Sequence, residues 1–397
     1  MRIVYIHQHF GTPQSASGTR SYVFSRHLAQ AGHEVTLLTS ESFLPHEFKR
    51  LKRFHIDGVR VINIRSGYTL RLKYYRRIFS FIVFMVLSTY WGIKSRPDVV
   101  FATSTPLTVA FPALVIKLFR GIPFVFEVRD LWPTVPVELG ILRNPIIIQA
   151  ARVFEKIAYH FADRIICISE GICLKISADP NKKRIIHTGC DLEGGPVAKD
   201  ISWKRDAGIL EEFLFVLTGA IGVVNSPQYV LHAARLLQQR GIENIAIAMI
   251  GNGSAKEKIK QMKRDQNLVH VYLFEAVPKK DVSHILAASD GGIILHGLSP
   301  TYRETASPNK FYDYIVAGLP VIFNFESPLK QLILKFGAGY YVNHLYPKQL
   351  ADLLIDLSKN PEKLVQSGKN AMKLAEACFD QKRQVDAFLK ALTEWPS

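Results

Sequence analysis

Residues 307–322, SPNKFYDYIVAGLPVI, read as a short helix that begins after a Ser-Pro pair and stops at a glycine before an apolar strand. Ser307 suits a helix cap and Pro308 suits the first turn, so free backbone N–H groups and the Lys310 ammonium would gather where an anion could sit. Asp313, about one turn further along, could accept hydrogen bonds from a pair of sugar hydroxyls. A capped helix without any ligand explains the same letters.

Around this stretch, apolar segments alternate with helical periodicity along the whole chain. Helices are expected at residues 21–31 and 227–239, and strands at 3–7, 34–39, 99–102, 124–128, 164–168, 213–218, 245–250, 269–274, 291–295 and 320–324. Strands that alternate with helices indicate parallel, doubly wound sheets, so the predicted fold class is α/β.

The length of 397 residues favours two domains over one core. The pattern weakens over residues 188–206, which are rich in glycine and charge, and we place the boundary there. We expect one domain at 1–198, a second at 199–375, and a C-terminal helix at 376–397 that packs back on the first. Sites of such sheets lie beyond the carboxyl ends of the strands, so the cleft between two facing domains is the expected site.

The formal charge of +16 predicts attraction to polyanions, which include nucleic acid, anionic lipid and phosphorylated small molecules. The basic residues are spread along the chain and form no recognisable RNA- or DNA-binding module, which argues against nucleic acid. The four cysteines show neither a C-x-x-C pair nor zinc spacing, as expected for reduced thiols of a cytoplasmic protein. The opening MRIVYIHQHF is typical of a first strand rather than a signal peptide.

Residues 78–93 form an uncharged stretch that is shorter than the roughly 20 residues needed to cross a bilayer. Two interpretations stay open. One is a buried helix. The other is a helix that rests in the cytoplasmic leaflet, held by its basic and aromatic neighbours Arg71, Lys73, Tyr74, Tyr75, Arg76, Arg77, Trp91, Lys94 and Arg96.

The common nucleotide-binding motifs are missing. There is no G-x-x-x-x-G-K-[ST], neither the loop after the first strand nor Gly251-Asn252-Gly253 completes G-x-G-x-x-G, and no D-x-D occurs. These absences argue against a P-loop kinase, a simple dehydrogenase and a metal-dependent diphosphate site. Backbone amides and basic side chains would have to hold a nucleotide diphosphate, and we expect no metal or other cofactor.

Seven segments in order carry a family resemblance: HQHF (7–10), SGTR (17–20), AGHEVTLLTS (31–40), FEVRDLWP (126–133), ADRIICISEG (162–171), TGAIG (218–222) and the stretch at 307–322. Together they resemble glycosyltransferase family 4, the retaining GT-B enzymes that use nucleotide sugars. Within that family the chain is most similar to bacterial enzymes of polysaccharide assembly that add amino or deoxyamino sugars.

The resemblance implies a donor site in the second half. In this family the helix before A-G-x-P-V carries the second carboxylate of an E-x7-E motif, which binds the donor ribose, and Asp313 matches it. The first carboxylate falls on Thr305, with Glu304 one residue out of register. The helix start then supplies candidate contacts to the donor phosphates or sugar: Ser307, Pro308, Asn309 and Lys310.

TGAIG matches the family's phosphate-facing turn, with Gly219 and Gly222 as candidate contacts. A basic residue often follows this turn in the family, whereas here the chain reads VVNS, so Lys310 and Arg20 are the candidate replacements. An ordinary tight turn between strand and helix is the alternative. The backbone around Val277 is the expected contact for the base.

The first half is expected to bind the acceptor. Glu127, Arg129 and Asp130 end a strand, where charges are costly to bury unless they have partners or face a cleft. Asp130 matches the family's catalytic loop, and Arg129 and Lys310 complete the candidate catalytic set, although Arg129 would also suit a structural ion pair with a carboxylate. The candidate acceptor-side residues are His7, His9, Gly18, Arg20 and Glu127.

The expected function is retaining transfer of an N-acetylated amino or deoxyamino sugar from a UDP-sugar to a lipid-linked glycan, by front-face attack, in O-antigen or capsule synthesis. The enzyme would be cytoplasmic and peripheral on the anionic inner face of the cell membrane. Two alternatives stay open: a non-hydrolysing UDP-sugar epimerase, and a catalytically silent GT-B partner subunit.

Overall fold

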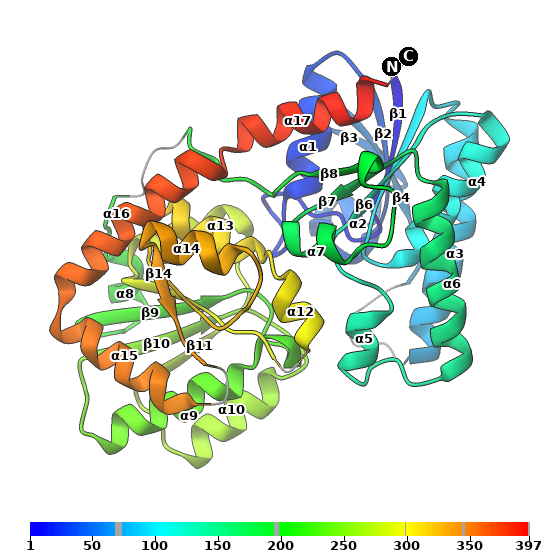
Figure 1. Cartoon of the computed structure of the whole chain (residues 1–397). Coiled ribbons are helices and arrows are strands. Elements are labelled where there is room, and N and C mark those ends of the chain that lie inside the picture. Colours follow the sequence, from blue (N-terminus) through cyan, green and yellow to red (C-terminus); the bar gives the residue numbers. More distant parts are fainter. Residues whose placement is uncertain (68–73, 194–197, 298, 344–345, 396–397) are drawn as a thin grey trace. The chain divides into compact units, whose positions relative to one another are not determined.

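The computed structural model describes residues 1–67, 74–193, 198–297, 299–343 and 346–395, and the chain divides into two compact units (Figure 1). Unit 1 comprises Met1–His187 and Arg383–Ser397, and unit 2 comprises Thr188–Lys382. The borders predicted from the sequence lie after residues 198 and 375 instead. The segment after residue 187 belongs to unit 2 because the Cys190 N–H donates to the Phe379 carbonyl at 2.6 Å and Cys190 bridges Asp380.

Unit 1 contains an eight-stranded sheet in the order β3-β4-β2-β1-β5-β6-β7-β8. Only the β3–β4 pair is antiparallel among the described strands. The strands are β1 (Arg2–Ile6), β2 (Glu34–Ser40), β3 (Arg53–Ile56), β4 (Val59–Ile64), β5 (Val99–Thr103), β6 (Phe124–Val128), β7 (Arg164–Cys167) and β8 (Lys183–Ile185).

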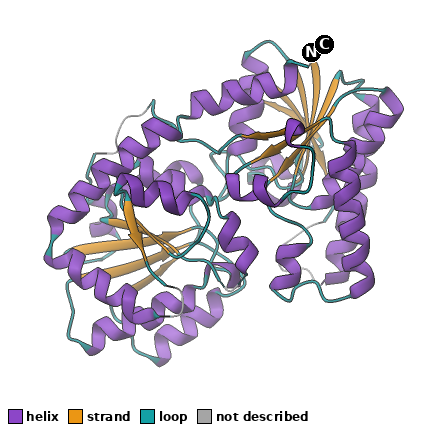
Figure 2. Cartoon of the chain, viewed as in Figure 1, coloured by secondary structure: helices purple, strands orange, loops and turns teal. Residues whose placement is uncertain are grey.

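Helices cover both faces of this sheet (Figure 2). They are α1 (Arg20–Gln30), α2 (His46–Lys49), α3 (Tyr74–Lys94), α4 (Ala110–Arg120), α5 (Thr134–Glu138), α6 (Pro145–Phe161), α7 (Glu170–Lys175) and α17 (Gln381–Thr393). The C-terminal helix α17 packs on the core of unit 1, where Phe388 contacts the rings of Tyr5, Phe24 and Phe101. Arg164 holds the end of α17 by donating to the carbonyl of Ala391 at 2.6 Å.

The apolar stretch at 78–93 lies within α3. Phe84 is buried, whereas Phe79, Val86 and Tyr90 are 67%, 56% and 53% exposed, so α3 is buried along one side and exposed along the other. None of the described helices is both long enough and apolar enough to span a bilayer. Arg71, Lys73 and the side chains of Tyr74, Tyr75 and Arg77 lie outside the described part.

Unit 2 contains a parallel six-stranded sheet in the order β11-β10-β9-β12-β13-β14. Its strands are β9 (Phe213–Thr218), β10 (Ile245–Ile250), β11 (Val271–Phe274), β12 (Gly291–Ile294), β13 (Val321–Phe323) and β14 (Gly339–Tyr341). Its helices are α8 (Ser202–Asp206), α9 (Pro227–Gln239), α10 (Lys256–Asp265), α11 (Val282–Ala287), α12 (Pro300–Thr305), α13 (Asn309–Val316), α14 (Leu329–Phe336), α15 (Pro347–Lys359) and α16 (Pro361–Cys378).

Each sheet has a point where the direction of strand addition reverses. In unit 1 the reversal lies between β1 and β5, and in unit 2 it lies between β9 and β12. Loops that leave the carboxyl ends of two such strands run to opposite faces of the sheet and open a crevice between them. The residues that follow β1, β5, β9 and β12 are therefore the first candidates for a binding site in each unit.

Candidate functional site

The loop that follows β9 is the first part of the candidate site in unit 2. Gly219 has φ +98°, a left-handed conformation that suits glycine. The Thr218 N–H donates to the hydroxyl of Tyr314 at 2.9 Å, so a fully buried side chain of α13 fixes the point where strand becomes loop. Gly222 leads into a short 3-10 turn, Val223–Asn225.

A second glycine loop supports the first from the end of β10. A Cβ on Gly251 would lie 1.7 Å from the Gly219 carbonyl oxygen, and one on Gly253 would lie 2.4 Å from the Ile221 carbonyl oxygen. Both positions therefore need glycine, because the two backbones touch. Gly251-Asn252-Gly253 does not complete a dinucleotide motif, and its role here is to support the loop after β9.

Lys310 lies beside the same loop. A Cβ on Gly219 would be 3.6 Å from Cε and 3.9 Å from Nζ of Lys310, and this ammonium has no hydrogen-bond partner among the residues described. Burial lowers the pKa of Lys310 to about 8, although Asp313 opposes the shift. The TGAIG turn and Lys310, both of which the resemblance assigns to the donor phosphates, thus lie next to each other.

The start of α13 differs from the prediction by one residue. The helix begins at Asn309, with Pro308 in the N-cap position instead of Ser307. The Ser307 hydroxyl lies 2.7 Å from the Tyr312 hydroxyl, and Asn309 Oδ1 accepts from Thr188 at 3.5 Å. The helix ends as predicted, with Ala317 as C-cap and Gly318 at φ +69°.

Asp313 forms an ion pair with Lys279 and is only partly exposed. The first carboxylate of E-x7-E is expected at Thr305 or, one residue out of register, at Glu304. Glu304 is exposed, whereas Thr305 is buried and donates to the Thr301 carbonyl at 2.8 Å. Val277 packs partly buried against the core of unit 2. Asp313 is therefore the carboxylate that stands next to the Lys310 helix start.

In unit 1, His7 and Arg129 meet beyond the ends of β1 and β6. His7 Nε2 lies 3.3 Å from an Arg129 guanidinium nitrogen. Burial, together with Arg129 and His9, lowers the pKa of His7 well below its usual value, so its ring stays neutral. Within the described residues the Arg129 guanidinium contacts His7 and forms no ion pair with a carboxylate, although its charge acts on both Glu127 and Asp130.

Asp130 follows directly, and burial raises its pKa to about 6 although Arg129 opposes the shift. His9 packs edge-on against Phe43 at 5.5 Å, and burial lowers its pKa to about 4. Gly18 lies in the loop between β1 and α1. A carboxylate that follows an arginine, which in turn contacts a neutral histidine, is an arrangement that can orient hydroxyl groups.

Arg20 and Glu127 form a fully buried ion pair at 2.6 Å. Glu127 also accepts from the Thr103 hydroxyl at 2.6 Å, and Arg20 donates to the Ile186 carbonyl at 3.0 Å and to the His187 carbonyl. Burial pushes the pKa of Glu127 up, but the charge and hydrogen bonds of Arg20 outweigh burial and hold it below its usual value. The pair ties α1, β6 and the end of β8 together.

The described residues include no group of three or more His, Cys, Asp and Glu side chains arranged to hold a metal ion.

Comparisons with known proteins assign both halves of the chain. Residues 16–180 match the family described as glycosyl transferase 4-like domain, and residues 201–374 match glycosyl transferases group 1. WbjE of Pseudomonas aeruginosa, a probable glycosyltransferase, is 24% identical over 297 residues, which span 71% of this chain and 70% of WbjE.

Two solved structures share the fold over the full length. Anabaena HepE, in complex with UDP and glucose, superposes with a TM-score of 0.75 at 13% identity and covers 100% of both chains. WaaG, a glycosyltransferase involved in lipopolysaccharide biosynthesis, superposes with a TM-score of 0.70 at 15% identity, covering 99% of this chain and 100% of WaaG.

The fold is therefore GT-B, built from two α/β units around parallel sheets. The chain is a glycosyltransferase, with a glycosyl transferase 4-like domain in its first half and a group 1 domain in its second.

Proposed function

We propose that this glycosyltransferase takes a sugar, an N-acetylated amino or deoxyamino sugar, from a UDP-sugar and adds it with retention to a lipid-linked glycan. The acceptor belongs to bacterial surface polysaccharide synthesis on the inner face of the cell membrane. The similarity to HepE, which was solved with UDP and glucose, and to WaaG, which acts in lipopolysaccharide biosynthesis, supports this direction.

One observation supports the donor site most strongly. The Lys310 ammonium is buried beside the Gly219 turn without a hydrogen-bond partner in the described chain. A buried cation that lacks a partner is costly, and a diphosphate would supply the missing charge and acceptors. Lys310 and the backbone N–H groups of the turn and of the α13 start would then stabilise the leaving UDP without a metal ion. Asp313 would accept from the ribose hydroxyls in place of Lys279.

We assign acceptor orientation to Asp130, Arg129 and His7. With a pKa near 6, the Asp130 carboxylate is charged at neutral pH and can accept a hydrogen bond from the attacking hydroxyl. Arg129 keeps that carboxylate charged by opposing the effect of burial. Because His7 stays neutral, it can donate and accept at the same time.

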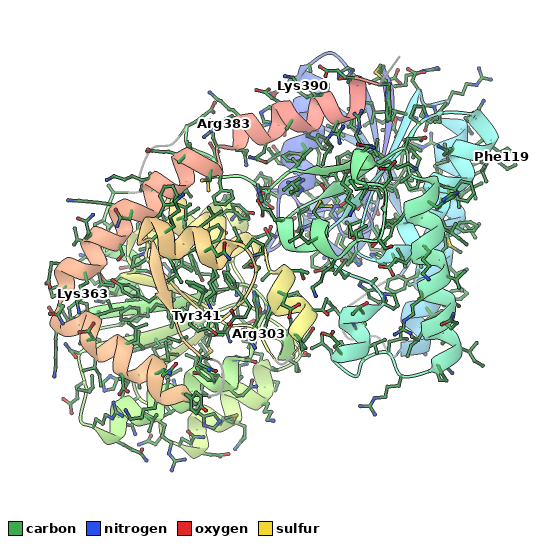
Figure 3. All side chains as sticks on the ribbon, in the orientation of Figure 1. Phe119, Arg303, Tyr341, Lys363, Arg383 and Lys390 are labelled. Atoms are coloured by element: carbon green, nitrogen blue, oxygen red, sulfur yellow. The ribbon has the colours of Figure 1, made fainter. Side chains whose placement is uncertain are left out.

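We assign membrane attachment to the α3–α4–α6 face, the outer surface of three helices that lie side by side on unit 1 (Figure 1). Phe119, at the outer end of α4, is 75% exposed (Figure 3). The other exposed apolar residues of this face are Phe79, Ile82, Val86, Leu87, Tyr90, Phe111, Leu118, Ile146, Ile147, Val153 and Phe161.

The charge of these three helices suits an anionic lipid surface. Their sequences contain one acidic residue, Glu155, against the basic residues Arg76, Arg77, Lys94, Lys117, Arg120, Arg152 and Lys156. Apolar side chains with a basic surround are the features of helices that lie in a membrane interface.

The donor proposal is tested by thermal stabilisation with UDP, GDP, ADP and dTDP on the wild type and on Asp313→Ala. A ligand at 100 times its Kd adds about 2.7 kcal/mol of stability. We expect UDP to stabilise the wild type most and Asp313→Ala much less. If no nucleotide stabilises the wild type, the donor site is wrong and the silent partner subunit becomes the better explanation.

A further inference from the structure

His296 follows β12, beside the point in unit 2 where strand order reverses between β9 and β12. The residue is 1% exposed, and in the described structure neither of its ring nitrogens has a hydrogen-bond partner. Burial, together with the nearby charges of Lys310 and Arg303, lowers the pKa of His296 to about 3. The ring is therefore neutral at physiological pH, with one N–H donor and one free acceptor.

Neighbouring elements hold His296 in place. Its backbone N–H donates to Asn324 Oδ1 at 2.7 Å, and Asn324 Nδ2 donates to its carbonyl at 2.9 Å. The imidazole packs edge-on to Tyr302 at 4.7 Å and lies 5.7 Å from the ring of Phe325. The Arg303 guanidinium, on α12 in Figure 3, donates to the Asn324 carbonyl at 3.1 Å. The position of His296 is thus built from α12, β12 and the end of β13.

His296 also adjoins the candidate donor site. The next residue, Gly297, donates its N–H to the Val224 carbonyl at 2.6 Å, and a Cβ there would lie 3.0 Å from the Val223 carbonyl oxygen. The chain around His296 therefore touches the turn that continues from Gly219–Gly222. Lys310, which lies beside Gly219 in that turn, acts electrostatically on the imidazole.

The chemistry of the ring suggests what it binds. Leaving a buried polar group without a hydrogen bond costs about 1–3 kcal/mol, and a neutral imidazole has two such groups. A phosphate only accepts hydrogen bonds, so it would satisfy the N–H and leave the other nitrogen alone. A sugar hydroxyl both donates and accepts, and two hydroxyls, or a hydroxyl and an amide, can satisfy both nitrogens.

We propose that His296 binds a polar substituent of the transferred sugar and thereby selects the donor, whereas Lys310 binds the diphosphate. This inference rests on the proposed UDP-sugar function. It assigns sugar recognition to a residue outside the expected E-x7-E positions, at one of which Thr305 bonds to its own helix.

If Lys310 binds the diphosphate and His296 binds the sugar, substitutions of Lys310 should affect UDP and UDP-sugars alike, whereas substitutions of His296 should affect only UDP-sugars. The test therefore compares the affinities of UDP and UDP-sugars by calorimetry without acceptor. The probes are UDP, UDP-glucose, UDP-galactose, UDP-N-acetylglucosamine and UDP-N-acetylgalactosamine. The variants are His296→Phe, which keeps the ring packing, His296→Gln, which keeps a donor and an acceptor, and Lys310→Met. Melting temperatures and circular dichroism check that each variant is folded.

For the UDP-sugar that the wild type binds best, His296→Phe should weaken binding about tenfold, equivalent to about 1.4 kcal/mol, and leave UDP within about twofold. His296→Gln should restore part of the loss. Lys310→Met should weaken UDP and UDP-sugar alike.

Two results would overturn the proposal while the UDP-sugar function stands. Equal weakening of UDP and UDP-sugar by His296→Phe would make the ring a diphosphate ligand. No weakening of either would make His296 a structural residue whose nitrogens bind buried water. If the wild type binds neither UDP nor any UDP-sugar, the proposed function fails first and this inference fails with it.

Discussion

At the scale of single residues, the described structure uses buried charge in two different ways. Arg20 and Glu127 satisfy each other inside unit 1, together with Thr103 and two backbone carbonyls. The Lys310 ammonium in unit 2 is buried and has no such partner within the described residues. The Arg20–Glu127 pair is structural, whereas a buried ammonium without a counter-charge, such as that of Lys310, is typical of an anion-binding site.

Glu127→Gln should be among the most destabilising polar substitutions in unit 1. It leaves the Arg20 guanidinium buried without a counter-charge, which costs about 3–5 kcal/mol. Urea unfolding at neutral pH measures the loss. The matched control is Asp98→Asn, because Asp98 pairs with Arg2 at the surface and such pairs contribute about 1 kcal/mol or less. Equal losses for the two variants would contradict a structural role for the buried pair.

The pH dependence of UDP binding should follow Lys310. Its pKa in the free protein is about 8, below the usual lysine value, so the ammonium is charged at pH 7 and loses its proton as the pH rises through 8. UDP affinity should therefore fall several-fold between pH 7.5 and about 9, with proton uptake on binding. His296, on which Lys310 acts electrostatically, is already neutral throughout this range.

Lys310→Arg is the control for that titration. Arginine keeps its charge over the whole pH range, and any change in the charge of the nucleotide with pH affects both proteins equally. Affinity profiles measured by calorimetry at several pH values should diverge above pH 8. Parallel profiles would mean that Lys310 does not contact the phosphates.

At the scale of elements, the sequence predicts the central strands well and the edges poorly. The bounds of β6, β9, β10 and α9 match the predicted ranges end to end. These strands are buried on both faces, so they read as continuous apolar runs. The strands β3, β8 and β14 were missed because short edge strands carry little apolar signal. The strand β4 was also missed, although most of its residues are buried. It pairs antiparallel with β3, so the prediction missed both strands of this pair.

Parts of the site were predictable for a similar reason. A glycine turn after a strand and a lysine at a helix start are local patterns, and the structure brings them together. His296 was missed because one histidine after a strand has no pattern of its own. Its burial depends on Asn324, Tyr302 and Phe325, which come from other elements. The pairing of Asp313 with Lys279 likewise joins residues far apart in sequence.

The contact between the two glycine loops gives a prediction for Gly251→Ala. Its Cβ would overlap the Gly219 carbonyl, so the turn must move, at a cost of about 1–3 kcal/mol. UDP affinity should fall about tenfold or more. Gly241→Ala is the control, because Gly241 has φ +68° but open space around it, so that only backbone strain is added. Similar UDP affinity in both variants would show that the turn does not bind the nucleotide.

The α3–α4–α6 face should carry membrane binding. Arg152→Glu with Lys156→Glu reverses two charges on α6, and Phe79→Ser with Val86→Ser removes exposed apolar surface on α3. The charge pair should weaken sedimentation with phosphatidylglycerol vesicles about tenfold or more, because each basic residue near such a surface is worth about 1 kcal/mol. The serine pair should also weaken it, because it removes apolar surface that would lie in the membrane interface. Lys258→Glu with Lys369→Glu makes the same charge change on exposed residues of unit 2 and should have little effect. If all three pairs of substitutions weakened sedimentation equally, the α3–α4–α6 face would not be the membrane-binding surface.

At the scale of the whole molecule, each unit is a doubly wound α/β body with polar residues beyond the carboxyl ends of its central strands. Unit 2 gathers Gly219, Lys310, Asp313 and His296, which suits a charged donor. Unit 1 gathers His7, Arg129 and Asp130, which suits a hydroxyl acceptor. The excess of basic residues along the chain favours both a nucleotide diphosphate and an anionic lipid surface.

The most direct test of this account is a transfer assay that supplies UDP-sugars to the purified protein with and without lipid-linked glycans extracted from bacterial membranes. Free UDP and the extended glycolipid are measured together by mass spectrometry. The account predicts UDP release that requires the lipid acceptor, a glycolipid heavier by one sugar, and loss of both products in Lys310→Met. Conversion of the UDP-sugar to its epimer without any acceptor, or product formation that Lys310→Met leaves unchanged, would contradict it.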